Sequence, residues 1–263
     1  MGLAEDFRFT GLTAVVTGAG SGIGRETAAV LAEAGARVIA ADLDGGAAED
    51  TAAHIVKTGG AAEARQVDVA EPAAVTRLVE GAVEQTGRLD VMVNNAGIML
   101  RRPALDITPE EFERVLSVNL KGVLYGCQSA ARVMKPGGSI VNTLSTIVDF
   151  STAGTGSYAA SKKGAEALTR TFAVELGPLG IRVNGVAPGW TDTGITRGRS
   201  LAENGAFDQQ GFDALAGRMA GSAPLGAVAT TRDTALAVLY LASRASRCVT
   251  GHVVRVNGGV SMV

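Results

Sequence analysis

The chain contains few cysteines and histidines and has no excess of basic residues, which argues against several kinds of site. Its 263 residues include only two cysteines, Cys127 and Cys248, which form no CxxC motif. Such a pair argues against a disulfide framework and fits the reduced cytosol. The formal net charge of −2 at pH 7 argues against a general nucleic-acid binder, which would need a basic surface. A local basic patch stays compatible with that charge.

Histidine is equally scarce. The two histidines, His54 and His252, lack the Cys or Asp partners of a metal site, and neither belongs to a nucleophile elbow. Acidic residues are more numerous but follow the spacing of helix surfaces. We therefore expect no bound metal and no catalytic pair of carboxylates.

Segments typical of membrane or secreted proteins are also lacking. No run of continuous apolar residues is long enough for a spanning helix. The first residues contain no basic segment followed by an apolar run, which argues against a secretory signal. We expect a cytoplasmic protein without nucleic-acid or membrane partners.

Small and apolar residues are plentiful, with 46% hydrophobic residues and 35 glycines. Short apolar runs predict strands at 12–17, 36–41, 63–67, 90–94, 139–144, 181–187 and 252–256. Amphipathic stretches between them predict helices near 22–34, 45–58, 72–86, 109–135, 158–178 and 230–243. The runs lack polar alternation, as is typical of parallel strands buried on both faces. The alternation predicts one α/β domain over residues 1–263, with a doubly wound parallel sheet of about seven strands and helices on both faces.

Two segments add detail to this pattern. Thr108 followed by Pro109 and Glu111 has the composition of a helix start, with an N-cap threonine, a first-turn proline and a capping-box glutamate. Residues 194–223 depart from the rhythm because they are rich in Gly, Ala and Asn. This segment is either a loosely folded surface insertion or a lid over a ligand site.

A glycine-rich turn follows the first predicted strand, over residues 18–24. Glycines allow the backbone to turn sharply and approach a ligand, and the helix that follows offers its N-terminal amides to a pyrophosphate. The spacing is G-x-x-x-G-x-G rather than the commoner G-x-G-x-x-G. The turn therefore predicts a dinucleotide site of the Rossmann type.

Asp42 ends the second predicted strand. A carboxylate at this place can accept hydrogen bonds from the adenosine ribose, and its charge repels a 2′-phosphate. We therefore expect NAD as the cofactor. Arg25 leaves NADP as the less favoured alternative, because its guanidinium lies close enough in sequence to meet such a phosphate. A third interpretation is that Asp42 only caps the next helix.

The motifs together resemble the short-chain dehydrogenases/reductases of about 250 residues. The resemblance runs from about residue 10 to Gly259 and rests on TGxxxGxG at 17–24, NNAG at 94–97, YxxxK at 158–162 and PGxxxT at 188–193. It implies that the cofactor is bound by Gly18, Ser21, Gly22, Ile23, Gly24, Asp42, Asp68, Val69, Asn95, Ala96, Gly97, Tyr158, Lys162, Pro188, Gly189, Thr191 and Thr193.

The same resemblance implies a catalytic set of Asn119, Ser145, Tyr158 and Lys162. Tyr158 would be the general acid/base, and the Lys162 charge would lower the pKa of its phenol. Ser145 would bind the substrate oxygen together with Tyr158, and Asn119 would hold a water that connects Lys162 to solvent. Asn257 stands where the family usually has Asp, which we expect to alter a hydrogen bond near a subunit contact.

These residues predict an NAD-dependent enzyme that interconverts a secondary alcohol and a ketone. The resemblance to the family further implies a homotetramer. The alternatives are an NADP-linked 3-oxoacyl-thioester reductase and a dinucleotide-sensing protein without turnover. The predicted substrate pocket is formed by residues 98–102, 146–156 and 194–223 together with Trp190. Its apolar residues suggest a neutral, moderately hydrophobic alcohol.

Overall fold

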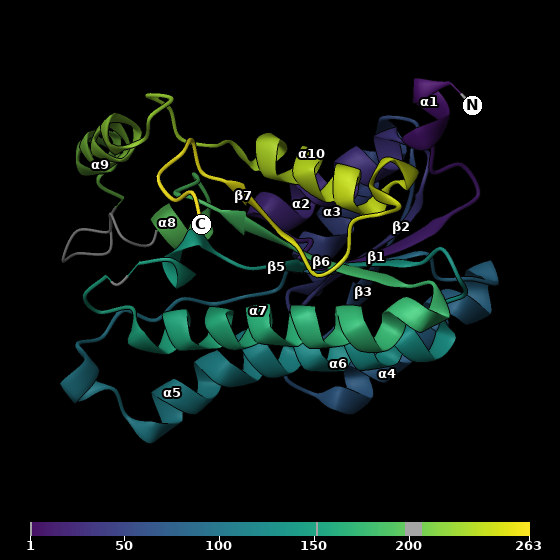
Figure 1. The fold of residues 1–263 in the computed structure, drawn as a ribbon, viewed down its shortest axis with the longest axis horizontal. Coiled ribbons are helices and arrows are strands. Elements are labelled where there is room, and N and C mark those ends of the chain that lie inside the picture. The colour runs from purple at the N-terminus through teal and green to yellow at the C-terminus, as the bar shows by residue number, and fades with distance from the viewer. Residues whose placement is uncertain (1, 151, 198–206) are drawn as a thin grey trace.

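Seven parallel strands form one sheet in the order β3-β2-β1-β4-β5-β6-β7 (Figure 1). The computed structural model describes residues 2–150, 152–197 and 207–263. The strands are β1 (Thr13–Thr17), β2 (Arg37–Asp42), β3 (Ala61–Gln66), β4 (Val91–Asn94), β5 (Ser139–Thr143), β6 (Arg182–Pro188) and β7 (Val253–Val256). The predicted sheet is confirmed, with strand ends displaced by one or two residues.

Helices cover both faces of the sheet, so that the domain has three layers (Figure 1). The helices are α1 (Leu3–Asp6), α2 (Gly22–Glu33), α3 (Gly45–Lys57), α4 (Pro72–Thr86), α5 (Pro109–Leu116), α6 (Gly122–Val133), α7 (Gly156–Leu176), α8 (Gly194–Arg197), α9 (Gln209–Ser222) and α10 (Thr231–Ala242). Short helical turns are η1 (Ala104–Asp106), the π-helical η2 (Ser117–Lys121), η3 (Thr146–Val148), η4 (Gly177–Leu179) and η6 (Arg244–Ser246). One face of the sheet packs on α4, α6 and α7, and the other on α2, α3 and α10.

The central strands are apolar on both faces because both faces are covered. In β1, Ala14 and Val16 pack with α2 and α10, whereas Val15 between them packs into the opposite core. All three side chains are fully buried. Continuous apolar runs of this kind are what a doubly covered parallel sheet requires.

Helix α5 begins as its sequence predicts. Thr108 accepts a hydrogen bond from the Glu111 backbone N–H, while the Glu111 carboxylate accepts one from the Thr108 N–H. Pro109 occupies the first helical position, where no N–H is needed. This capping box fixes the start of the helix and with it the path of the preceding loop.

The structure departs from the predicted helices in two places. The single helix expected over 109–135 is divided by the π-helical turn η2 and ends at Val133. The irregular segment expected over 194–223 contains the fourteen-residue helix α9, which Asp208 caps by accepting a hydrogen bond from the Gly211 N–H at 2.9 Å. Residues 198–206 of that segment lie outside the described residues.

The chain leaves the sheet on opposite faces after β1 and β4, which are neighbours in the sheet. The helix after β1 is α2 on one face, whereas α5 and α6 follow β4 on the other. A change of direction of this kind leaves a crevice outside the carboxyl ends of the strands. The predicted site residues therefore meet at one edge of the sheet, although they come from separate parts of the sequence.

Candidate active site

A cavity of about 890 Å³ lies at the carboxyl ends of the strands. It is lined by nearly all the residues predicted to bind cofactor or act in catalysis: Gly18, Ser21, Gly22, Ile23, Asp42, Asp68, Val69, Asn95, Ala96, Gly97, Ser145, Tyr158, Lys162, Pro188, Gly189, Thr191 and Thr193. Gly24 and Asn119 are the two predicted residues that do not line it. Both lie directly behind the lining.

The glycine-rich turn needs the absence of side chains at two positions. A Cβ at Gly18 would lie 2.8 Å from the Ala96 Cα, and Gly18 has a φ of 65°. A Cβ at Gly24 would lie 2.0 Å from the Gly18 carbonyl oxygen. Glycine at both positions allows the turn to pack on α2, whose N-terminal amides then face the cavity. This cradle fits the pyrophosphate of a dinucleotide.

Asp42 is held by two backbone amides. Its Oδ2 accepts a hydrogen bond from the Gly20 N–H at 2.8 Å, and its Oδ1 accepts one from the Asp44 N–H at 3.0 Å. Asp42 lines the cavity, and each of its oxygens keeps a lone pair for a further hydrogen bond. The carboxylate is therefore fixed where it can accept hydrogen bonds from ribose hydroxyls.

Asn95 joins the ends of three neighbouring strands. Its Nδ2 donates to the carbonyl oxygens of Thr17 and Gly18 at 3.1 and 3.2 Å, and its Oδ1 accepts from the Thr143 hydroxyl at 3.3 Å. This bonding spans β1, β4 and β5 and fixes the floor of the cavity. The part of Thr143 could not be predicted from the sequence, because it depends on a strand neighbour 48 residues away.

Tyr158 and Lys162 lie one turn apart on α7, and both side chains are buried. Burial raises the pKa of the Tyr158 phenol, and a hydrogen bond with Ser145 offsets part of this rise. Burial also lowers the pKa of Lys162 to about 8. Lys162 does not contribute to the shift of the tyrosine pKa in this structure, so the lowering predicted from this lysine is not seen.

The Lys162 ammonium is held at the end of β5. Its Nζ donates a hydrogen bond to the Thr143 carbonyl oxygen at 2.7 Å. Gly97 lies next to it, because a Cβ added there would come within 3.4 Å of the same Nζ. The ammonium is therefore fixed between two strand ends while it lines the cavity.

Asn119 sits in the π-helical turn and is fully buried. Its amide exchanges hydrogen bonds of 2.8 Å with the backbone N–H and carbonyl of Ile98, and its Nδ2 also donates to Ser161. Such turns widen a helix locally and are frequent at functional sites. Oδ1 keeps one lone pair to which a water can donate, and the water at Asn119 stays a prediction.

Comparison with known proteins agrees with this arrangement. The family model described as "Enoyl-(Acyl carrier protein) reductase" matches residues 18–261. A (3R)-3-hydroxyacyl-CoA dehydrogenase of Canis lupus familiaris is 38% identical, over 99% of this chain and 100% of that protein. The mitochondrial borneol dehydrogenase of Lavandula x intermedia is 39% identical, over 97% and 93%. A crystal structure of a short-chain type dehydrogenase/reductase from Mycobacterium marinum superposes with a TM-score of 0.89 at 31% identity and covers 100% of both chains.

The chain belongs to the short-chain dehydrogenase/reductase family. It is therefore an oxidoreductase, and the family binds a nicotinamide dinucleotide. No described helix of this short-chain dehydrogenase/reductase is long and apolar enough to cross a membrane. The individual roles of its site residues stay predictions.

Helix α9 lines the cavity through Leu215 and Met219. The helix is anchored by Phe212, whose ring centroid lies 5.3 Å from that of Trp190 in the cavity wall. Phe207 packs on the other side of Phe212 at 5.4 Å. The apolar residues at 212, 215 and 219 have helical spacing, a signal that the many glycines obscured.

Some lining residues were missed by the sequence analysis. Leu43, Val118, Asn257 and Val260 line the cavity as well. The Asn257 amide folds the C-terminal segment back on itself by donating to the Ser261 carbonyl and accepting from the Gly259 N–H, both at 2.9 Å. A subunit contact near Asn257 stays a prediction. The hydrogen bonds within residues 257–261 could not be predicted, because so short a segment after the last strand contains no sequence pattern that indicates them.

Proposed function

We propose that this chain is an NAD-dependent oxidoreductase that interconverts a secondary alcohol and a ketone, with Tyr158 as general acid/base. The observation that supports it most is the convergence of Ser145, Tyr158 and Lys162 on the cavity that also contains the glycine-rich turn. A buried phenol beside an open cavity is placed to exchange a proton with a substrate oxygen. The chemistry that a bound nicotinamide supplies is acceptance of a hydride, together with a positive charge beside the phenol.

Each side chain has a distinct part in the proton transfer. Ser145 donates a hydrogen bond to the substrate oxygen and stabilises the charge that develops there. Tyr158 takes the hydroxyl proton during oxidation and returns it during reduction. Burial lowers the pKa of Lys162 to about 8, so its amine can both release and take up a proton near neutral pH. The buried phenol alone would ionise poorly, so the positive charges of Lys162 and the nicotinamide are needed to offset its desolvation.

The environment of Asp42 supports NAD. Its carboxylate is fixed on the Gly20 amide and would repel a 2′-phosphate at the same place. Arg25 does not compensate, because its Nη2 donates to the Gly20 carbonyl oxygen at 2.6 Å and its Nε to the Thr51 hydroxyl at 3.2 Å. The one guanidinium that we considered as a phosphate partner is thus engaged elsewhere.

The substrate end of the cavity supports a hydrophobic alcohol. Apolar side chains line it, among them Ile147, Leu215 and Met219. The relative named a borneol dehydrogenase makes a cyclic alcohol a suitable first candidate. An acyl thioester is the second candidate, since Arg101 lines the same cavity and can pair with an anionic group, and another relative is named a hydroxyacyl-CoA dehydrogenase.

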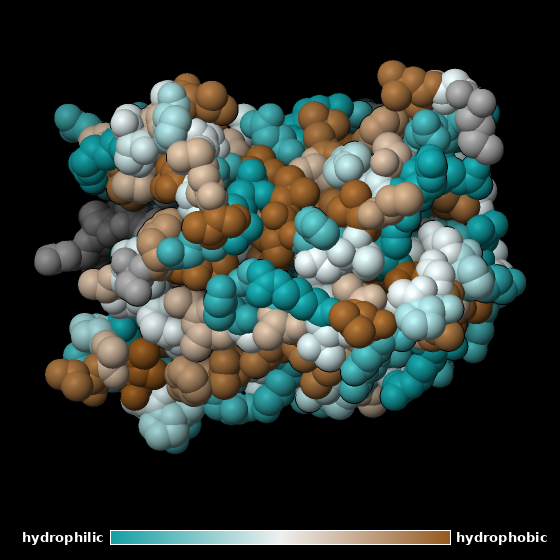
Figure 2. All heavy atoms as spheres, viewed as in Figure 1, coloured by the Kyte–Doolittle hydropathy of each residue, from teal (hydrophilic) through white to brown (hydrophobic). Residues whose placement is uncertain are grey.

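We further propose that the protein is a cytoplasmic homotetramer. The edge strand β7 is only half-buried along its length, and Figure 2 shows apolar residues at the surface between α7 and α10. Val174 on α7 is 78% exposed, and Leu105 near α5 is 99% exposed. Exposed apolar side chains on α7 and near α5, together with the edge strand β7, favour contacts with further copies of the chain.

The proposal is tested by following the absorbance of reduced nicotinamide with NAD and NADP in separate reactions. The alcohols are borneol, a 3-hydroxyacyl-CoA, a steroid alcohol, a sugar alcohol and a linear secondary alcohol, and Tyr158→Phe is the control. We expect NAD-linked turnover of at least one alcohol by the wild type only. NADH binding without turnover of any alcohol would favour the sensing protein instead, and a preference for NADP would contradict the role given to Asp42.

A further inference from the structure

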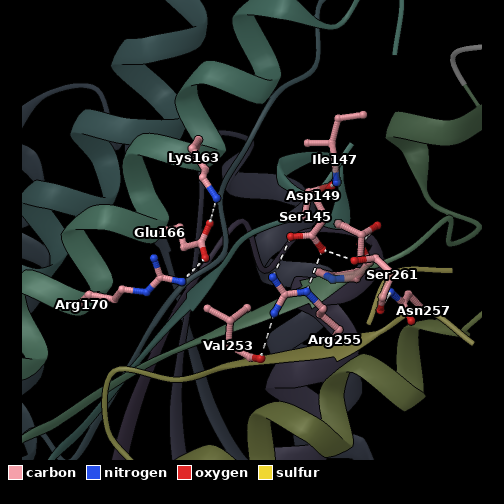
Figure 3. A network of polar contacts seen from close by, with 12 residues as sticks. Ser145, Ile147, Asp149, Lys163, Glu166, Arg170, Val253, Arg255, Asn257 and Ser261 are labelled. Atoms are coloured by element: carbon pink, nitrogen blue, oxygen red, sulfur yellow. Dashed lines mark hydrogen bonds and ion pairs between the residues drawn. The ribbon is translucent and has the colours of Figure 1, made fainter. Parts of the chain in front are cut away.

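A buried ion pair lies four residues beyond Ser145 (Figure 3). The Arg255 Nε and Nη2 atoms donate to the two carboxylate oxygens of Asp149, each at 2.7 Å. The side chains are 3% exposed for Asp149 and 14% exposed for Arg255. The Ser261 hydroxyl donates to the same carboxylate. Asp149 thus joins the loop after β5 to the strand β7 and to the C-terminal segment.

The loop between Ser145 and Asp149 is one short helical turn. Ser145 caps η3 by accepting a hydrogen bond from the Ile147 N–H at 3.2 Å, and its carbonyl accepts from the Val148 N–H at 3.3 Å. The Asp149 N–H closes the turn on the Thr146 carbonyl oxygen at 3.0 Å. Displacing one end of so short a turn displaces the other end as well.

The partner of Asp149 is held by the sheet itself. Arg255 belongs to β7, where it stands in register with Ala187 of β6. A second buried carboxylate, Glu166 on α7, attracts the same guanidinium while it pairs with Lys163 and Arg170 (Figure 3). Arg255 is therefore a fixed point to which Asp149 can be tied.

A buried ion pair is a poor means of gaining stability alone, because desolvation of both charges offsets most of their attraction. What a bidentate pair gives is a defined geometry. Resting on the function proposed above, we propose that Asp149 and Arg255 are positioning residues that set the place of the Ser145 hydroxyl in the active site. The C-terminal segment shares in this through Ser261, so the last residues of the chain contribute to the order of the catalytic loop.

Arg255→Met removes the guanidinium and retains an unbranched side chain of similar reach. The matched control is Arg88→Met, since Arg88 makes the same bidentate contact with Asp90 at 2.7 and 2.8 Å at the amino end of β4. For the best alcohol of the panel we expect Arg255→Met to lower kcat roughly tenfold, because small displacements of catalytic groups have effects of this size. Arg88→Met should leave kcat unchanged.

A double-mutant cycle with Ser145→Ala separates positioning from general damage. If Arg255 acts through Ser145, Arg255→Met lowers kcat roughly tenfold in the wild type and less than about twofold in Ser145→Ala. Equal losses in both backgrounds would overturn the proposal. Arg255→Lys, which keeps the charge but not the bidentate geometry, should recover part of the rate. If Arg255→Met does not fold, Arg255→Lys takes its place in the double-mutant cycle.

Hydrogen exchange tests, without any turnover, whether the Asp149–Arg255 pair orders the loop that carries Ser145. Failure of the positioning role can therefore be told apart from failure of the proposed function. We expect faster amide exchange over residues 145–149 and 257–261 in Arg255→Met than in Arg88→Met, with NADH affinity unchanged. Unchanged exchange in both segments would contradict the positioning role even in an active enzyme. Faster exchange in a protein that turns over no alcohol would support the ordering of the loop by Arg255 and contradict the proposed catalytic function.

Discussion

The Lys162 Nζ lies 5.8 Å from the centroid of the Tyr158 ring, and both side chains are buried at the same end of α7. The cavity therefore contains a phenol and an ammonium that are both poorly solvated. Burial disfavours the ionised form of each, raising one pKa and lowering the other. Burial therefore moves the two pKa values apart and leaves that of Lys162, at about 8, nearer to neutral pH, where the proposed proton transfer takes place.

Lys162 should make stability depend on pH in a defined window. Its pKa is about 8 in the folded chain against 10.5 as the ordinary value, so between these values the unfolded chain binds more protons. The free energy of unfolding therefore rises as the pH increases from about 8 to about 10.5, by about 3 kcal/mol. Denaturant unfolding over this range should show the rise in the wild type and its absence in Lys162→Met. An identical rise in the variant would contradict the assigned pKa.

The glycine-rich turn should not tolerate a methyl group at Gly24. The added Cβ would lie 2.0 Å from the Gly18 carbonyl oxygen, so Gly24→Ala should destabilise the fold by about 2 kcal/mol or more and weaken NADH binding. The control is Gly81→Ala in α4, where no described atom lies within 4 Å of the added Cβ. That variant should be more stable by about 0.5–1 kcal/mol. Thermal unfolding and NADH titration measure both effects.

Cofactor selection should change when Asp42 is replaced. Asp42→Ser removes the negative charge and two acceptor oxygens, so we expect NAD affinity to fall roughly tenfold and the preference for NAD over NADP to weaken by at least as much. Asp44→Ser, two residues away on the N-cap of α3, should leave that preference unaltered. A retained preference in Asp42→Ser would mean that other groups exclude the 2′-phosphate.

The contact between Phe212 and Trp190 should govern how α9 covers the cavity. Phe212 is 5% exposed, and its replacement by Ala leaves a gap beside the only tryptophan of the chain. We expect a higher KM for the alcohol, a smaller effect on kcat, and altered tryptophan fluorescence. Leu236→Ala is the control: Leu236 on α10 is 45% exposed, and its replacement should change none of these three quantities. Equal KM values in both variants would argue against a covering role for α9.

Much of the site could be predicted because its residues follow strands directly. Gly18 follows β1, Asn95 follows β4 and Ser145 follows β5 by two residues, so a correct order of apolar runs already places them at one edge. Tyr158 and Lys162 add the helical spacing of four residues, which is equally local. Such features are written in consecutive residues and need no knowledge of distant contacts.

Other features depend on contacts that short patterns do not contain. Asp149 and Arg255 are 106 residues apart, and neither stands in a motif. The π-helical turn around Asn119 results from the tertiary hydrogen bonds of its amide to Ile98. Helix α9 is hard to predict because Gly211, Gly217 and Gly221 lower its helical propensity, while burial of Phe212 against Trp190 stabilises it.

The central claim is that Tyr158 moves the proton, and it is tested most directly by comparing the wild type with Tyr158→Phe at saturating NAD. The variant loses only the hydroxyl, so NADH binding should be retained within about twofold while kcat falls by roughly a thousandfold or more. That result would assign the acid/base role to the phenol. A variant that binds NADH and keeps more than about a tenth of the wild-type kcat would contradict it, because another group would then carry the proton.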